Sequence, residues 1–286
     1  MKVNRMITVA AASLLLLSCS DSITAGDKYK LVWSDEFNEA AVDTTSWDFF
    51  HGWAWNEEDQ YYTADAANAY IKDGLLVIQA NKVHVPNPEY KAGTSDNNTR
   101  RQYIDYTSAR LSTEGKREFI YGRFEMRARL PLAAGAWPAF WTLGTKRPWP
   151  DNGEIDIMEM YRVNGENNIL ANVAWGSSEP LKPVWSTKKM PISQLKYDDP
   201  RWEEKFHVWR MDWDRSYIRL YVDNMLLNEV PLRQVCNASD GVNPYRDLPQ
   251  YIVLNLAIGG LCGGKVDDTA FPMKYEIDYI RVYQKK

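Results

Sequence analysis

Tyr121-Gly-Arg-Phe-Glu-Met-Arg-Ala-Arg-Leu130 alternates apolar and charged side chains from one residue to the next. In an extended chain, one face of this segment carries Phe124, Met126, Ala128 and Leu130, and the other face carries the charged residues. This two-residue period predicts a β-strand that packs against a core on one side only.

The same period recurs along the chain, in the segments 75–80, 208–213, 217–223, 251–258 and 275–283. Turn-forming clusters separate these segments, and no long amphipathic helix competes with them. Many strands without helical spacers favour an all-β antiparallel sandwich. With 286 residues, no internal repeat and no second region of distinct composition, a single large domain is expected.

A strand-like run at Gly153-Glu-Ile-Asp-Ile-Met-Glu-Met160 contains three acids. Glu154 and Asp156 share one face of a pleated strand, whereas Glu159 lies an odd step away and would point to the other face. We therefore expect a β-bulge near Ile157 or Met158, which would bring all three acids to one face. Buried acids are unfavourable unless they are paired or used, so these are the candidate catalytic residues.

Two carboxyl groups on one face suit glycosyl transfer. A separation of about 5–5.5 Å allows one to act as nucleophile and the other as proton donor with retention, whereas about 6.5–9.5 Å leaves room for a water and inversion. Strand geometry alone does not choose between the two. The alternative is a solvated edge strand with polar alternation, but the apolar partners and the tryptophan-rich segment just upstream favour a central strand.

Other segments accompany the acid run in a fixed order. They are Trp33-Ser-Asp-Glu-Phe37, Asn56-Glu-Glu-Asp-Gln-Tyr-Tyr62, Ala136-Trp-Pro-Ala-Phe-Trp141, Phe206-His-Val-Trp209, Asn255-Leu-Ala-Ile-Gly-Gly260 and Asp278-Tyr-Ile-Arg-Val-Tyr283. Together with Glu-Ile-Asp-Ile-Met-Glu, they resemble glycoside hydrolase family 16, in the form typical of laminarinase-like endo-β-1,3(4)-glucanases. The resemblance covers nearly the whole chain from about residue 29.

This resemblance implies a concanavalin A-like jelly roll of two curved sheets with a substrate cleft on the concave face. It implies that Glu154 is the nucleophile, Glu159 the acid/base and Asp156 the residue that tunes them, with retention of configuration. Relatives often have a histidine at the position of Ala174, so the hydrogen bond of that histidine is absent or supplied differently here. The aglycone-side specificity is the property that this difference affects most.

Further residues are expected to bind substrate, because the family places their strands and loops in the cleft. These are Asn56, Glu58, Arg110, Trp137, Trp141, Trp175 and Asn255. Trp137 and Trp141 lie four residues apart and face the same way in a strand, so they could stack on sugar rings or form a core pair. The family also suggests a structural calcium at Glu36 and Asp278, with ordinary surface acids as the alternative; catalysis requires no cofactor.

The N-terminus combines a basic start with a short apolar run, which predicts a signal peptide over residues 1–18. Leu16-Leu-Ser-Cys19 resembles the bacterial lipobox, so Cys19 is the expected lipidation site and residues 19–28 a lipidated tether before a catalytic domain at 29–286. The alternative is a signal peptide with an incidental cysteine. The lipobox predicts a protein anchored in the outer membrane or at the cell surface by its lipid alone.

Composition narrows the range of partners. A net charge of −4 gives no basic surface for nucleic acid, and a β-glucan polysaccharide bound by a monomer is the expected partner. Cys236 and Cys262 could form a disulfide after export or stay free. The leading hypothesis is a retaining endo-β-glucanase that cuts β-1,3 or β-1,4 bonds of laminarin or mixed-linkage β-glucan. A relative acting on agar, porphyran or carrageenan and a non-catalytic glycan-binding module are the alternatives, and the second gains nothing from two glutamates and Asp156.

Overall fold

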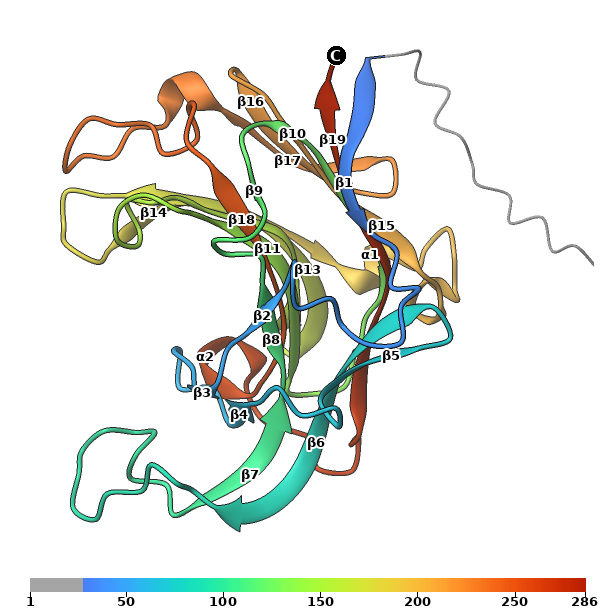
Figure 1. Cartoon of the computed structure of the whole chain (residues 1–286), viewed down its shortest axis with the longest axis vertical. Coiled ribbons are helices and arrows are strands. Elements are labelled where there is room, and N and C mark those ends of the chain that lie inside the picture. Colours follow the sequence, from blue (N-terminus) through green and yellow to red (C-terminus); the bar gives the residue numbers. More distant parts are fainter. Residues whose placement is uncertain (1–27) are drawn as a thin grey trace, which may run out of the picture.

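The computed structural model describes residues 28–286 and shows two β-sheets stacked face to face (Figure 1). Alternating sequences form many of the strands, because such a strand buries one row of apolar side chains between the sheets and leaves the other row outside. The all-β jelly roll expected from the sequence is confirmed. Within residues 28–286, no helix is long and apolar enough to cross a membrane.

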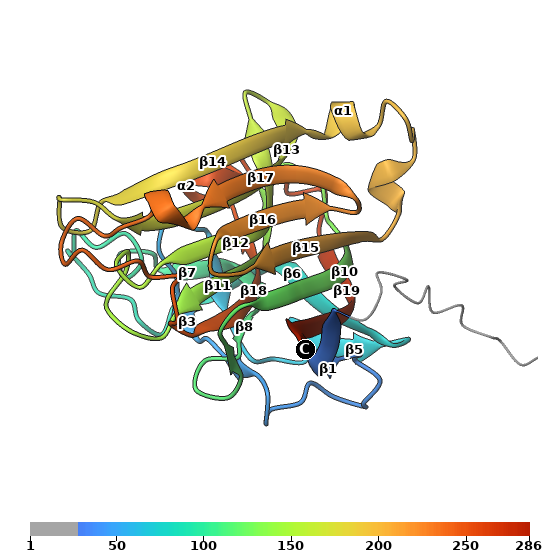
Figure 2. The ribbon, with the colours of Figure 1, turned by 90° about the horizontal axis from the view of Figure 1, so that it is seen from above.

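The larger sheet has eleven strands, with the path β17-β16-β15-β10-β19-β6-β7-β4-β3, and β1 and β5 added on β19 and β6. Figure 2 shows β15, β16 and β17 lying side by side. The bounds are β1 Tyr29–Asp35, β3 Gly52–Trp53, β4 Gln60–Tyr62, β5 Ala69–Lys72, β6 Leu75–Pro86, β7 Tyr103–Ser108, β10 Gly122–Arg129, β15 His207–Trp213, β16 Tyr217–Val222, β17 Met225–Pro231 and β19 Met273–Lys285.

The smaller sheet has eight strands, with the path β14-β13-β12-β11-β18-β8-β2 and β9 added on β18. Its strands are β2 Asp48–Phe49, β8 Arg110–Ser112, β9 Glu118–Phe119, β11 Ala136–Gly144, β12 Glu154–Val163, β13 Glu166–Gly176, β14 Pro183–Pro191 and β18 Gln250–Ile258. Short helical turns occupy loops, at α1 Ile192–Leu195, η1 Trp202–Glu204, η2 Leu232–Gln234 and α2 Gly260–Gly263.

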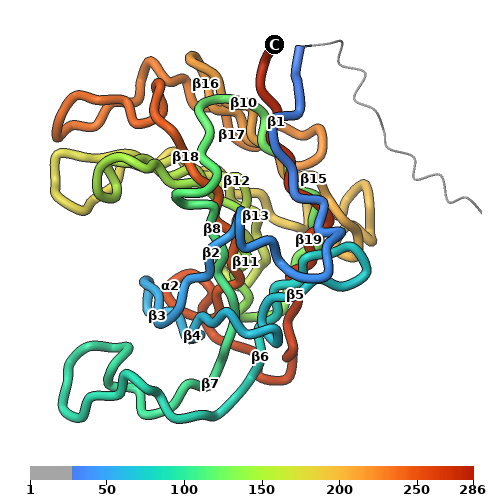
Figure 3. The backbone as a smooth tube through the Cα atoms, viewed as in Figure 1, coloured from blue at the N-terminus to red at the C-terminus, as the bar shows by residue number. Residues whose placement is uncertain are grey.

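The core lies between the two sheets. Phe124, Met126 and Ala128 of β10 are fully buried in it, as the alternation of that segment predicts. Figure 3 shows the start of β1 beside the end of β19, and the two strands pair from Tyr29 opposite Lys285 to Asp35 opposite Ile280. The described domain therefore begins and ends at the same place.

Candidate active site

β12 brings the three acids to one face of the smaller sheet, which we call the catalytic face. Glu154 and Asp156 pair with β13 in regular register, and the register then shifts before Glu159. The shift leaves Ile157 and Met158 buried in the core between the sheets. The bulge predicted from the spacing of the acids is confirmed, and without it Glu159 would point into the core.

Indole and amide groups hold the two glutamates. Trp137 Nε1 donates a hydrogen bond to Glu159 Oε1 (2.8 Å), and Asn172 Nδ2 donates to Glu159 Oε2 (2.8 Å) and to Asp156 Oδ2 (3.0 Å). Trp149 Nε1 donates to Glu154 Oε2 (2.6 Å) from the loop before β12. Each glutamate therefore has a fixed orientation before substrate arrives.

Burial raises the pKa of all three carboxyls. The pKa of Asp156 lies well above its usual range because of burial and the charges of the two glutamates beside it. Burial, with the charge of Glu154, raises the pKa of Glu159 to about 7, although Trp137 and Asn172 favour its ionised form. The pKa of Glu154 is also raised by burial, opposed by the hydrogen bond from Trp149.

These shifts separate three chemical roles. The raised pKa of Asp156 favours its protonated form, and its hydrogen bonds to Glu154 and Glu159 favour the ionised forms of those two carboxyls. Asp156 thus acts on Glu159 through a hydrogen bond that lowers its pKa, and the neighbouring charge that raises the pKa of Glu159 is that of Glu154. Glu159 can hold a proton at neutral pH, and it would lose this repulsion whenever Glu154 is neutralised by a covalent bond.

One row of paired residues extends from Glu159 across the sheet. Glu159 pairs with Ala139 on β11, Ala139 with Asn255 on β18, and Asn255 with Arg110 on β8. Trp141 Nε1 donates to Asn255 Oδ1 (2.8 Å), and the guanidinium of Arg110 lies 4.9 Å from the Trp141 ring centroid. The structure thus brings Arg110, Trp141 and Asn255 together beside the acids.

Glu58 is a further acid on the side of the site that contains Arg110. It is buried, and its Oε2 accepts hydrogen bonds from Gln60 Nε2 (2.6 Å) and Tyr62 OH (3.3 Å). Burial raises the pKa of Glu58, opposed by these bonds, by the charge of Arg110 and by a hydrogen bond with Asn56. Asn56 has a left-handed backbone (φ 62°) that aims its exposed side chain at Glu58.

Trp137 and Trp141 lie on the catalytic face, where their indole N–H groups bind site residues. Trp175, in contrast, was expected in the cleft and is not there. It follows Ala174 by one residue on β13, so it points to the opposite face and packs against the core between the sheets. The exposed tryptophan of this region is Trp185, which pairs with Ala174 from β14.

The carboxylates proposed for a calcium site each bind an arginine. Both oxygens of Glu36 accept from Arg281 (2.9 and 2.7 Å), and Asp278 Oδ2 accepts from Arg127 Nη1 (2.5 Å). A cation at either acid would have to displace a guanidinium, so these residues do not fit the calcium site. Residues 28–286 contain no cluster of three or more His, Cys, Asp or Glu side chains arranged for a metal.

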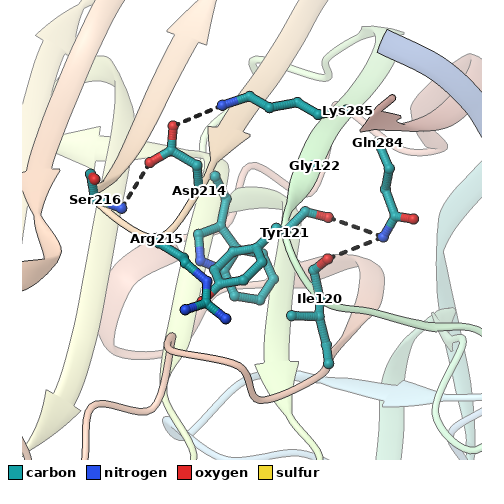
Figure 4. A pocket seen from close by; sticks show the side chains of 9 residues that line it. Ile120, Tyr121, Gly122, Asp214, Arg215, Ser216, Gln284 and Lys285 are labelled. Atoms are coloured by element: carbon teal, nitrogen blue, oxygen red, sulfur yellow. Dashed lines mark hydrogen bonds and ion pairs between the residues drawn. The ribbon is translucent and has the colours of Figure 1, made fainter. Parts of the chain in front are cut away.

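A cavity in the described residues lies elsewhere. It has a volume of about 540 Å³ and is lined by residues that include Tyr121, Asp214, Arg215 and Lys285 (Figure 4), and none of the catalytic acids contributes to it. Cys236 and Cys262 are both free thiols, so the disulfide is absent.

Comparison with known proteins identifies the family of this chain. The sequence profile described as "Glycosyl hydrolases family 16" matches residues 56–281. The chain belongs to this family. It is a glycoside hydrolase, and Glu154 and Glu159 lie within the matched residues, on the catalytic face.

The family 16 chain resembles its relatives over nearly its full length. It is 36% identical to a "Beta-glucanase" of Rhodothermus marinus over 99% of this chain and 97% of that protein. It superposes on the laminarinase catalytic domain of Thermotoga maritima with a TM-score of 0.75 and 34% identity, covering 91% and 100% of the two chains. It also superposes on a structure from a study of endo-acting O-glycanases of human gut bacteria. The TM-score is 0.80 and the sequence identity 32%, over 91% of this chain and 92% of that chain.

The sequence analysis did not identify two residues that donate hydrogen bonds to the catalytic acids. Asn172 could have been found, because it lies two residues before Ala174 on the strand after the acid run, and residues two apart share one face of a strand. Trp149 could not, because it lies in an irregular loop between β11 and β12 and reaches Glu154 only through the path of that loop.

Proposed function

We propose that this family 16 chain is a retaining endo-β-glucanase that hydrolyses internal β-1,3 or β-1,4 bonds of laminarin or mixed-linkage β-glucan. The observation that carries the proposal is the pair Glu154 and Glu159 on one face of β12, with the pKa of Glu159 raised to about 7. The likeness to a β-glucanase and a laminarinase supports the substrate.

The reaction follows from the two roles. Glu159 gives its proton to the glycosidic oxygen while the Glu154 carboxylate attacks the anomeric carbon, so the reducing-side fragment leaves and a glycosyl ester forms. The ester removes the negative charge of Glu154, which lowers the pKa of Glu159. Glu159 can then accept a proton from water as that water attacks, and the ester bond breaks to release the sugar and restore Glu154.

Product analysis tests the substrate. Wild-type protein is incubated with laminarin, barley β-glucan, agarose and keratan sulfate, and the products are separated by size and their anomeric configuration followed by NMR. We expect a mixture of oligosaccharides from a glucan with initial retention. Initial inversion would overturn the mechanism, and products from agarose or keratan sulfate alone would overturn the substrate.

The alternatives predict different outcomes of the same experiment. A galactan-acting or O-glycan-acting enzyme remains the second candidate for substrate, because a similar structure comes from work on O-glycanases. A non-catalytic binding module would release no product. It is disfavoured by the three acids and the donors from Trp137, Trp149 and Asn172 that orient them.

We also propose that the mature enzyme is anchored by a lipid on Cys19. Cys19 and the signal sequence before it lie outside the described residues, so the proposal rests on the lipobox-like Leu16-Leu-Ser-Cys19 and the apolar run.

A further inference from the structure

A second row of paired residues runs through Glu154 toward the edge of the sheet. Glu154 pairs with Ala174 on β13, and Ala174 pairs with Trp185 on β14. Residues directly opposite one another in antiparallel strands project from the same face, so Trp185 lies on the catalytic face. At roughly 4.8 Å per strand, its Cα is about 10 Å from that of Glu154, which is about the length of a disaccharide.

Trp185 differs from the other tryptophans of the catalytic face. The indole N–H groups of Trp137, Trp141 and Trp149 all donate to site residues. Within residues 28–286, the Trp185 indole has neither a hydrogen-bond partner nor a stacked ring or cation, and 43% of the residue is exposed. An exposed, unpartnered indole on a sugar-processing face has its apolar surface available for a ligand.

The residue between Glu154 and Trp185 across the sheet is small. Ala174 is fully buried, and its side chain is only a methyl group, so this strand raises no long side chain between Glu154 and Trp185. Trp141, Asn255 and Arg110 lie on the opposite side of β12, on β11, β18 and β8. On the β13–β14 side, Asn172 orients the acids and Trp185 is a candidate platform for a sugar ring.

We propose that Trp185 is a specificity-determining residue that stacks on a sugar ring of the bound polysaccharide, at a distance from the ring that Glu154 attacks. The proposal rests on the proposed glycosidase function of Glu154 and Glu159 but not on which β-linked sugar is cleaved. The ligand is the apolar face of a pyranose ring two or more positions from the ring whose anomeric carbon Glu154 attacks.

Paired substrates test this platform. An oligosaccharide or polysaccharide reaches β14, whereas a 4-nitrophenyl glycoside of the same sugar ends at its leaving group. We expect Trp185→Ala to lower the ratio of kcat/KM on the long substrate to kcat/KM on the aryl glycoside by about tenfold. Trp185→Phe, which keeps a flat ring, should recover most of the ratio.

Val184→Ala is the matched control, because Val184 is a neighbouring exposed residue of β14 that points to the other face. It should leave the ratio unchanged. An unchanged ratio in Trp185→Ala, or a Phe variant no better than the Ala variant, would overturn the proposal. The ratio is measured on whichever polysaccharide the wild type cleaves. If that polysaccharide were a galactan, the proposed glucan substrate would be refuted, but the ratio would still show whether Trp185 contacts the substrate. Thermal melts of each variant confirm that it is folded.

Discussion

At the scale of single residues, the environment of each carboxyl assigns its role more firmly than its position in the sequence does. Glu154 and Glu159 are the same residue type on the same strand, yet Glu159 is the one whose pKa rises to about 7. Trp149 stabilises the ionised form of Glu154, as a nucleophile requires. Burial and the two glutamates raise the pKa of Asp156, which disfavours a third charge beside Glu154 and Glu159.

Replacing Glu159 and replacing Glu154 should therefore affect the reaction in different ways. Glu159→Ala should lose about 10²–10⁴-fold on polysaccharide, because general acid catalysis is removed, but retain glycosylation by activated aryl glycosides. Azide should rescue it and give a β-glycosyl azide, identified by NMR. Glu154→Ala should form no covalent intermediate and should join an α-glycosyl fluoride to an acceptor. A β-azide from Glu154→Ala together with an α-azide from Glu159→Ala would exchange the two roles.

The pH profile should report the proton on Glu159. The acid is protonated below its pKa of about 7, so kcat/KM on polysaccharide should fall as pH rises through that value. Trp137→Phe removes a donor that favours the carboxylate, so it should raise the pKa of Glu159 and move the alkaline limb to higher pH. Tyr161→Phe, which leaves this hydrogen bond in place, is the control. A limb that stays in place or moves to lower pH in Trp137→Phe would contradict the assignment.

At the scale of elements, the sequence was sufficient where side-chain periodicity dictates geometry. The alternation at Tyr121–Leu130 predicts β10, and the odd spacing of Glu159 predicts the bulge in β12. Periodicity fails where a residue's face depends on register with another strand. Trp175 was expected among the substrate-binding residues, although it lies an odd number of residues from Asn172 and so faces the other way. Trp185 was not identified, because only its pairing with Ala174 places it on the face of the acids.

The bulge itself can be tested by deleting one residue. Removing Ile157 would place Glu154 and Glu159 an even number of residues apart, so a regular strand would keep Glu159 on the catalytic face and Met158 in the core. We expect the folded deletion variant to keep measurable hydrolysis, because both carboxyls would still lie on one face. Ile157→Val keeps the bulge and should retain activity at a cost of about 0.5–1.5 kcal/mol of stability. Complete loss of hydrolysis in a folded deletion variant would contradict this expectation and would show that the bulge itself, and not only the shared face, positions Glu159.

At the scale of the whole molecule, the larger sheet is held on its outer face by arginine–carboxylate pairs. Arg281 binds Glu36 across β1 and β19, and Arg127 binds Asp278 across β10 and β19. These pairs occupy the place where the family resemblance suggested calcium. We therefore expect the melting temperature to be the same in EDTA and in excess calcium, measured by calorimetry with magnesium as the control ion. A rise specific to calcium would restore the cation site.

The arrangement of the termini suits attachment to a membrane. The described domain begins beside its own C-terminal strand, where Lys286 N donates to Lys28 O, and Figure 1 shows this point on the side away from the loops that follow β13 and precede β7. A lipid on Cys19 would thus hold the domain by the end remote from these loops. Polysaccharide could reach the catalytic face of an anchored enzyme.

Replacing Cys19 tests the anchor. A single acyl chain binds membranes only marginally, whereas two or more chains hold a protein stably, so wild-type protein should fractionate with membranes. Cys19→Ala removes the acceptor and should move the enzyme to the soluble fraction or leave an uncleaved precursor of higher mass. Cys236→Ala is the matched control, because it removes an exposed cysteine outside the lipobox and should not change the fractionation. If Cys19→Ala remained membrane-bound at the mature mass, attachment would not depend on a lipid at this residue.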